Sequence, residues 1–293
     1  MKFQIVAIGE VLWDLLPGGR QLGGAPANFA YHASALGGNS RLISRVGGDE
    51  LGREALHLLK RVGVATDCVQ VDETRPTGTV GVQVASDGQP RFTIHENVAW
   101  DAIRNEAAGS DAIAGAHAVC FGSLAQRSEP SRSTIRSLVT ASPRPALRIL
   151  DVNLRQHYFS PRLIEESLAL ANVLKLNDGE LPRLSEIFHL EGDIPSRLSQ
   201  LASRYNLRTI AYTRGSGGSL LFSEGRWSDH PGASVAVVDT VGAGDSFTAA
   251  MTLGLLSGWD LDRINEHANQ VAAHVCSRAG AMPELPHNLR QMA

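Results

Sequence analysis

The feature that most constrains the fold of this chain is an alternation of short apolar segments with longer helical patterns. Segments rich in Val, Ile and Leu, each with the length of a buried strand, occur at residues 3–8, 41–46, 117–121, 147–152, 172–176, 208–213 and 235–238. Helical patterns such as residues 50–62, which Gly63 ends, separate most of them. This alternation predicts an α/β fold of three layers, α/β/α, with a mainly parallel central sheet and helices on both faces.

Residues 66–95 interrupt the alternation. Two segments rich in β-branched residues, 79–84 and 91–94, flank Asp87-Gly88, a pair typical of a hairpin turn. We therefore expect a small antiparallel sheet that stands off the main domain.

Composition excludes several partners. The 293 residues carry 27 Lys and Arg against 30 Asp and Glu, a net charge of −3, with no basic run long enough to follow a phosphate backbone, so nucleic acid is not expected. Charges such as Glu10 and Asp14 interrupt every apolar stretch before the ~20 residues that a bilayer crossing needs, so no membrane partner is expected. The three cysteines form no CxxC pair, which predicts a cytoplasmic location.

The most informative segment is residues 234–247, a predicted strand followed by a glycine-rich turn and a helix. The turn Gly242-Ala243-Gly244 can aim consecutive backbone N–H groups at one point, where the helix N-terminus adds its positive dipole end, so it predicts an anion site. Asp245, in the first helical turn, is placed to accept a proton from an incoming hydroxyl. The alternative is a plain helix start whose acidic residue complements the dipole.

A second glycine cluster also precedes a predicted helix. Gly23-Gly24 comes shortly before Asn28, and Asp14 lies just upstream, after the first strand. Amide and carboxylate groups bind vicinal hydroxyls, so these residues predict a site for a small polyhydroxylated ligand. The alternative is an ordinary turn before a helix.

Further polar clusters follow predicted strands. Asn177 and Glu180 have the spacing of a helix capping box, and residues 151–155 and 213–218 again place polar groups where a strand ends. Open α/β sheets collect their ligands at the carboxyl ends of their strands. Together the clusters favour a ligand site at that edge of the sheet.

Several chemistries lack their motifs. The sequence contains no GxxxxGK[ST] loop, no HExxH and no GxSxG, and the first strand is not followed by GxGxxG. A P-loop enzyme, a zincin, a serine hydrolase and a dinucleotide oxidoreductase are therefore disfavoured.

Two long gapped patterns resemble the signatures of the ribokinase or PfkB family of carbohydrate kinases. The N-terminal pattern comprises Gly23-Gly24, Pro26, Asn28, Ala30, Gly37 and Gly47. The C-terminal one comprises Asp239-Thr240-x-Gly242-Ala243-Gly244-Asp245 followed by Ala249-Ala250-Met251. The resemblance extends from Gly9 to about Pro286.

The resemblance implies a fold, a reaction and partners. We expect one ribokinase-like kinase domain over residues 1–293, with a β-sheet lid formed by about 11–22 and 66–100. It further implies ATP and Mg²⁺ dependence and transfer of the γ-phosphoryl group to a hydroxyl of a small sugar. Lids in this family often pair between subunits, which implies a homodimer through the lid.

The resemblance also implies roles for residues. Asp245 resembles the catalytic base and the N–H groups of Gly242, Ala243 and Gly244 the anion hole. The implied sugar-binding set is Asp14, Gly23, Gly24, Asn28 and Asn153. The implied nucleotide set is Thr213, Gly215, Gly218, Asn269, Gly280 and Ala281. Asn177 and Glu180 resemble the element that organises Mg²⁺ through water, and Asp239 stands where some relatives bind K⁺.

The substrate expected from the sequence is D-fructose; the alternatives are 2-keto-3-deoxygluconate and the substrate of another PfkB-type sugar or nucleoside kinase. Gly9-Glu10-x-Leu12-x-Asp14-x-x-Pro17 and Asp151-x-Asn153-x-Arg155 resemble the branch that contains the fructose and 2-keto-3-deoxygluconate kinases. Arg155 either steadies the transferring phosphoryl group or pairs with a substrate carboxylate. Residues 93–100, at the end of the expected lid, match no pattern of one substrate. A protein that is not an enzyme, a sugar or nucleotide sensor built on the same fold, is a further alternative. The presence of Asp245 and of the glycine turn disfavours it.

Overall fold

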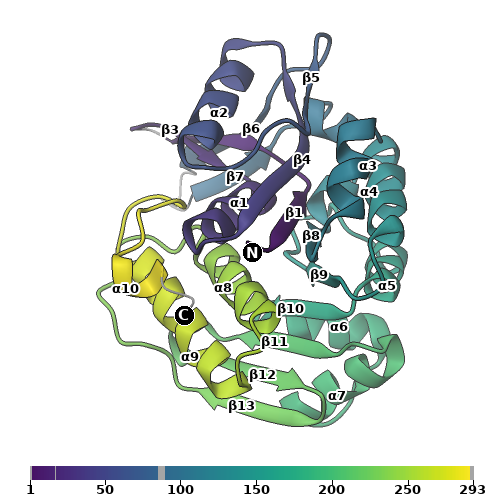
Figure 1. Ribbon diagram of the computed structural model, residues 1–293, viewed down its shortest axis with the longest axis vertical. Coiled ribbons are helices and arrows are strands. Elements are labelled where there is room, and N and C mark those ends of the chain that lie inside the picture. Colours follow the sequence, from purple (N-terminus) through teal and green to yellow (C-terminus); the bar gives the residue numbers. More distant parts are fainter. Residues whose placement is uncertain (1, 17, 85–89, 291–293) are drawn as a thin grey trace.

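In the computed structural model, which describes residues 2–16, 18–84 and 90–290, the strands form two separate sheets (Figure 1). The larger sheet has nine strands in the order β13-β12-β11-β10-β9-β8-β1-β4-β5. In chain order these are β1 Gln4–Ile8, β4 Asn39–Gly47, β5 Val69–Asp72, β8 Ala118–Gly122, β9 Leu147–Asp151, β10 Val173–Asn177, β11 Thr209–Thr213, β12 Ser219–Ser223 and β13 Arg226–His230. The strands from β11 to β5 run parallel, and β12 and β13 add an antiparallel hairpin at one edge.

Helices cover both faces of this sheet (Figure 1). One face carries α1 Ala25–Ala35, α2 Glu50–Arg61, α8 Ala243–Leu256, α9 Leu261–Cys276 and the short α10 His287–Arg290. The other carries α3 Ala107–Ala114, α4 Glu129–Ala141, α5 Pro161–Leu170, α6 Glu180–Phe188 and α7 Ile194–Tyr205. Of the helices described, none has the length and apolar character needed to cross a membrane.

Each face of the sheet has its own hydrophobic core. In β1, Ile5 and Ala7 pack into the core beneath α1 and α8, while Val6 and Ile8 pack into the core beneath α3 to α5. Side chains alternate between the two faces of a strand, so a strand buried on both faces must be apolar at every position. This explains the continuous apolar segments of the sequence and confirms the predicted three-layer α/β/α fold.

The smaller sheet has the order β3-β2-β6-β7, with β2 Leu12–Leu16, β3 Gly19–Gly23, β6 Gly78–Val84 and β7 Pro90–Ile94. The pairing of β6 with β7 is antiparallel, as predicted; the predicted Asp87-Gly88 turn between them lies outside the described residues. Pairing of β2 with β6 is parallel, so the sheet is mixed. Within residues 66–100, β5 belongs to the larger sheet, beside β4.

The predicted strand at residues 235–238 was wrong. These residues form an irregular segment between β13 and α8, in which Val237 and Val238 are 61% and 64% exposed. The sheet edge is instead occupied by the β12–β13 hairpin, whose turn residues Glu224 and Gly225 both have positive φ. Because the hairpin takes the edge position, these residues have no strand to pair with, and Val237 lines a cavity described below.

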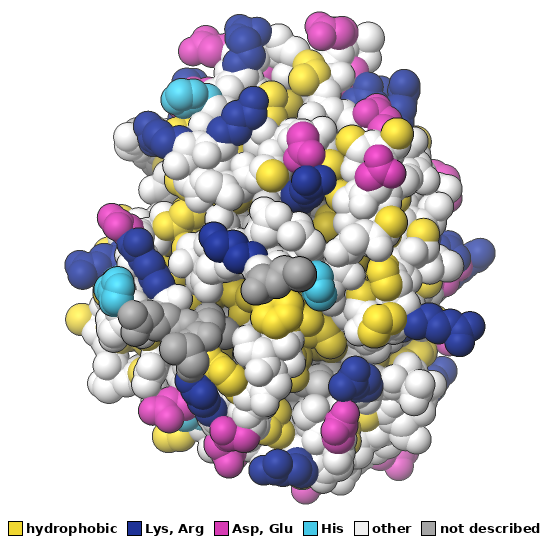
Figure 2. Space-filling view, in the orientation of Figure 1, with side chains coloured by type: hydrophobic (Ala, Val, Ile, Leu, Met, Phe, Trp, Pro, Cys, Tyr) yellow, Lys and Arg dark blue, Asp and Glu magenta, His cyan; other side chains and the backbone are white. Residues whose placement is uncertain are grey.

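The strand order has a switch point beside β1, where a ligand crevice is expected. From β1 the chain proceeds to β4 and β5 on one side, then crosses to β8 and continues outward through β11 on the other. Loops leaving the carboxyl ends of β1 and β8 therefore diverge, and ligands of open α/β sheets bind at such a switch point. On the face shown in Figure 2, basic and acidic side chains are interspersed rather than gathered into a basic stripe.

Candidate active site

The N-terminus of α8 lies at this crevice and begins with a tight turn. Gly242 has φ 78°, and a Cβ there would lie 2.5 Å from the carbonyl oxygen of Ala281, so only glycine fits. The first N–H groups of a helix have no acceptor within the helix and carry its positive dipole end. The turn that we predicted from the sequence to bind an anion therefore lies at a helix N-terminus, where free N–H groups and the helix dipole favour an anion.

Asp245, in the first turn of α8, meets a residue from the other end of the chain. Its Oδ2 accepts a hydrogen bond of 2.8 Å from Nδ2 of Asn28, on α1. Burial raises the pKa of Asp245 from 3.8 to about 6, and the charge of Asp151 adds to the rise. Above that pH the carboxylate is ionised, buried and able to take a proton.

Three of the residues assigned to the sugar, Asp14, Gly23 and Gly24, lie at the start of α1, the helix that carries Asn28. Gly24 precedes α1 with φ 103°, and a Cβ on it would lie 2.4 Å from the carbonyl oxygen of Glu10. A Cβ on Gly23 would lie 2.6 Å from Oδ2 of Asp14, on β2, so Asp14 adjoins the same turn. Burial raises the pKa of the Asp14 carboxyl. Oδ1 of Asn28 is buried without a hydrogen-bond partner among the described residues and is free to accept one.

A cavity of about 480 Å³ lies on the other side of the turn. Ala243 and Gly244 line it together with four residues assigned to the nucleotide from the sequence: Thr213, Gly215, Gly218 and Asn269. Sequence reasoning missed its apolar wall, which includes Val235, Val237, Phe247, Ala272 and Cys276. A glycine-lined cavity with an apolar wall that opens onto an anion turn suits a nucleotide.

Gly280 and Ala281 lie behind the turn rather than in the lining of this cavity. The Asp239 carboxylate joins the two loops, because Oδ1 accepts from the N–H of Val241 and Oδ2 from the N–H of Gly280, each at 3.0 Å. His32 contacts the carbonyl oxygen of Ala281 at 2.9 Å through Nε2. In this structure these residues support the turn from behind.

Asn177 and Glu180 form a reciprocal capping box. The Asn177 side-chain oxygen accepts from the N–H of Glu180 at 3.0 Å, and Oε2 of Glu180 accepts from the N–H of Asn177 at 2.8 Å. Oε1 of Glu180 accepts from the N–H of Leu154 at 2.9 Å, which ties the loop after β9 to the start of α6. Within the described ranges, no group of three or more His, Cys, Asp or Glu side chains is arranged to hold a metal ion.

The loop after β9, residues 152–160, carries Asn153 and Arg155. Asn153 has a positive φ of 42°, and the exposed Arg155 guanidinium acts electrostatically on Glu10, Asp14 and Asp245. Arg155 therefore lies within electrostatic range of Asp14 and of the predicted base, Asp245.

Sequence reasoning missed a buried charged group under the turn. Lys175, on β10, lies 3.2 Å from Oδ1 of Asp151, on β9, and Oδ2 of Asp151 accepts from Thr248, on α8, at 3.2 Å. A lysine inside the apolar segment 173–176 was the available signal, because a buried charge needs a partner. Glu10 was also missed: it is 3% exposed, burial raises its pKa to about 7, and its Oε2 has no partner among the described residues.

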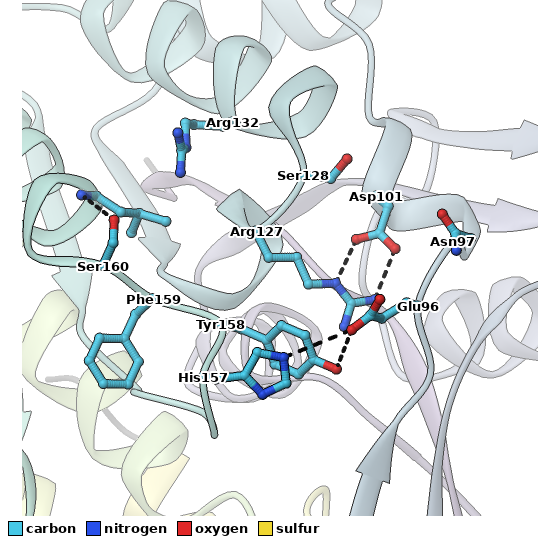
Figure 3. Close-up of a pocket in the computed structure, with 11 residues that line it drawn as sticks. Glu96, Asn97, Asp101, Arg127, Ser128, Arg132, His157, Tyr158, Phe159 and Ser160 are labelled. Carbon is cyan, nitrogen blue, oxygen red and sulfur yellow. Dashed lines mark hydrogen bonds and ion pairs between the residues drawn. The ribbon is translucent and has the colours of Figure 1, made fainter.

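Residues 93–100 end at a second cavity, of about 400 Å³, centred on Arg127 (Figure 3). Arg127 donates to both carboxylate oxygens of Asp101, at 2.8 and 2.9 Å, and to the carbonyl oxygen of His95 at 2.6 Å. Its guanidinium lies over the rings of Trp100 and Tyr158, at 4.0 and 4.7 Å from their centroids. This cluster fastens the end of the smaller sheet to the loops after β8 and β9.

Comparison with known proteins gives the family. The model of the pfkB family of carbohydrate kinases matches residues 18–288. A fructokinase of Klebsiella pneumoniae is 33% identical over 305 residues, which cover 98% of this chain and 97% of that protein. The crystal structure of an uncharacterized sugar kinase from Pyrococcus horikoshii in complex with ATP is 30% identical, with a TM-score of 0.80 over 95% of this chain and 94% of that one.

The fold has a further match in a fructokinase of Xylella fastidiosa with bound ATP, at a TM-score of 0.84, 23% identity and coverage of 98% and 96%. The family match spans most of the chain, including both glycine turns and the cavity beside α8. This chain belongs to the pfkB family of carbohydrate kinases and is a sugar kinase, an ATP-binding phosphotransferase with an alcohol group as acceptor.

Proposed function

We propose that this protein transfers the γ-phosphoryl group of ATP to a hydroxyl of D-fructose, with Asp245 as the base. The observation that carries the proposal is the Asn28–Asp245 hydrogen bond, which joins the predicted sugar residues to the first turn of α8, directly beside the nucleotide cavity. Three of the relatives more than 30% identical over nearly the whole chain are bacterial fructokinases, which supports fructose as acceptor.

The chemistry needs little from the protein beyond position and charge. The sugar hydroxyl oxygen forms a bond to the γ-phosphorus as the bond from that phosphorus to the β–γ bridging oxygen breaks. The proton of the hydroxyl passes to Asp245, and ADP leaves with the bridging oxygen. The N–H groups of Gly242, Ala243 and Gly244 hold the negative charge of the transferring group. Asp14, Gly24 and Asn28 hold the sugar.

The substrate is tested by following ATP consumption over a panel of sugars that includes D-fructose, D-ribose and 2-keto-3-deoxygluconate. Fructose should give the highest kcat/KM. Activity on the keto acid and none on fructose would show that the proposed substrate is wrong, while the assignment as a sugar kinase would stand. Failure to consume ATP with any sugar would favour the sensor alternative.

Arg155→Ala distinguishes the two sugars further. With a neutral ketohexose, we expect lower kcat and a nearly unchanged KM for the sugar, because the guanidinium then acts mainly on charge that develops during transfer. With a carboxylate substrate, loss of the pair should weaken binding by about 1.5 to 3 kcal/mol. Steady-state kinetics with the sugar varied measures the split. Arg144→Ala, a change of an exposed arginine in the loop between α4 and β9, is the control.

Mg²⁺ would accompany ATP in the proposed reaction. Asn177 and Glu180 would hold the water molecules around the ion, and the ion would neutralise phosphate charge. Both Glu180 oxygens already accept backbone N–H groups, and each keeps a lone pair for water. Glu180→Gln should therefore raise the Mg²⁺ concentration for half-maximal rate severalfold. It should also lower stability, by about 1 kcal/mol, because the amide oxygen can accept only one of the two backbone N–H groups. A capping role alone predicts the same stability loss with an unchanged Mg²⁺ curve, so the Mg²⁺ titration decides between the two roles.

The remaining assignments extend the proposal. The smaller sheet would act as a lid that excludes water, since β2 carries Asp14, whose carboxylate adjoins the Gly23-Gly24 turn. Leu15 and Leu16 on β2 are 37% and 36% exposed, and covering them would favour a homodimer through this sheet. We also propose that Asp239 takes part in binding K⁺. The protein would act in the cytoplasm, where ATP is made.

A further inference from the structure

Lys175 lies directly beneath the glycine turn. It is the third residue of β10, and its side chain, 7% exposed, points to the face of the sheet that α8 covers, as does that of Val173. A Cβ placed on Gly244 would lie 3.0 Å from the Lys175 ammonium nitrogen. The missing side chain of Gly244 is thus what lets a buried cation approach the predicted anion site.

The ammonium is held in place and keeps its charge. Its one hydrogen bond to a described residue is that to Asp151, which Thr248 holds in turn, so two of its three donors remain available. Burial alone would lower the pKa of Lys175, but neighbouring carboxylates outweigh it and the pKa is raised; they are Asp151, Glu180 and Asp245. Lys175 is therefore protonated at neutral pH.

A purely structural role does not account for this arrangement. Buried ion pairs are often no more stabilising than apolar residues of the same volume, because desolvation offsets their attraction. The position of the cation also fits a binding role: it lies beside Gly244 in the first turn of α8, where the N–H groups of a helix have no acceptor within the helix. A phosphoryl group in the turn would bring negative charge within reach of the two available donors.

We propose that the Lys175 ammonium contacts the γ-phosphoryl group of the bound nucleoside triphosphate, from the β10 side of the turn. This inference rests on the proposed function and adds a residue to it. Lys175 donates hydrogen bonds and keeps all three protons, while the proton of the sugar hydroxyl still passes to Asp245. The cation would bind the triphosphate and follow the phosphoryl group as it transfers.

The test compares triphosphate and diphosphate binding without sugar, so that no turnover is needed. Calorimetric titration of Lys175→Met with Mg²⁺ and the β,γ-imido analogue of ATP should show affinity reduced about 10- to 100-fold, the range for a charge-assisted hydrogen bond. Affinity for ADP should change less than about twofold. Lys175→Arg should recover part of the triphosphate affinity. Lys60→Met, a change of an exposed lysine on α2, is the matched control and should change neither the affinity for the ATP analogue nor the affinity for ADP.

The double variant Lys175→Met/Asp151→Asn removes both charges of the buried ion pair and replaces the single variant if that one does not fold. Equal losses for ATP analogue and ADP, or no loss for either in a folded variant, would assign Lys175 to structure alone and overturn the proposal. Failure of the wild-type chain to phosphorylate any sugar would instead overturn the proposed function, and the sugar-free titration would still report on Lys175.

Discussion

Asp245→Asn should lower kcat by about 100-fold or more while ATP and sugar affinities stay nearly unchanged. Asparagine keeps the size of the side chain and its place beside Asn28, but it cannot accept the proton of the acceptor hydroxyl. Single-turnover kinetics and calorimetric binding measure the two quantities separately. Asp262→Asn, which changes an exposed aspartate in the first turn of α9, is the matched control. Turnover of Asp245→Asn equal to that of the control would remove Asp245 from the role of base.

The raised pKa of Asp245 predicts how activity depends on pH. Because the base must be ionised, kcat/KM should fall as pH drops below about 6 and level off above it. The ascending limb should vanish in Asp245→Asn, whose residual activity should be nearly independent of pH across this range. A wild-type limb near pH 4 would mean that neither burial nor Asp151 perturbs the carboxyl in solution.

The same variant should be more stable than the wild type at neutral pH. A carboxyl whose pKa rises from 3.8 unfolded to about 6 folded binds its proton more tightly in the folded state. Folding stability therefore decreases as pH rises from about 4 to about 6, and the full cost remains above that range. Asparagine removes this cost, so the free energy of unfolding at pH 7.5 should rise by up to about 3 kcal/mol, with almost no gain at pH 3.5. Denaturation at both pH values measures the difference.

Asp101→Ala should lower the free energy of unfolding by about 3 to 5 kcal/mol, the range for removing one partner of a buried ion pair. The Asp101 and Arg127 side chains are 8% and 6% exposed, and the loss of Asp101 leaves the guanidinium buried between two aromatic rings without a counter-charge. Urea denaturation measures the change. The KM for the sugar should also rise, because Arg127 anchors the segment that leaves the smaller sheet (Figure 3).

Two controls define the Asp101 result. Glu186→Ala breaks an exposed pair with Arg183 and should change stability by less than about 1 kcal/mol. The double variant Asp101→Leu/Arg127→Met removes both charges and should recover much of the loss. If Asp101→Ala costs no more than Glu186→Ala, the cluster does not anchor the smaller sheet.

The local pattern of apolar residues in the sequence was sufficient to predict most of the fold. The apolar segments at 3–8, 147–152 and 208–213 each coincide with a strand, because a strand buried on both faces leaves a continuous apolar signature. The same rule failed at 235–238, where an apolar segment lines a cavity instead of joining the sheet. It also missed β12 and β13, although Glu224-Gly225 is a turn signal, because their edge position leaves a mixed polar pattern.

By itself the sequence determined where the chain turns and which turns can bind an anion, since glycine's freedom at Gly24 and Gly242 and the period of the strands are local properties. Only the tertiary structure decided which charges meet. Asn28 and Asp245 are 217 residues apart in the chain, and Lys175 approaches Gly244 only because β10 lies beneath α8. The physical reason is that burial and Coulomb interaction depend on distances in space, so the environment of a titratable group emerges only when distant segments pack together.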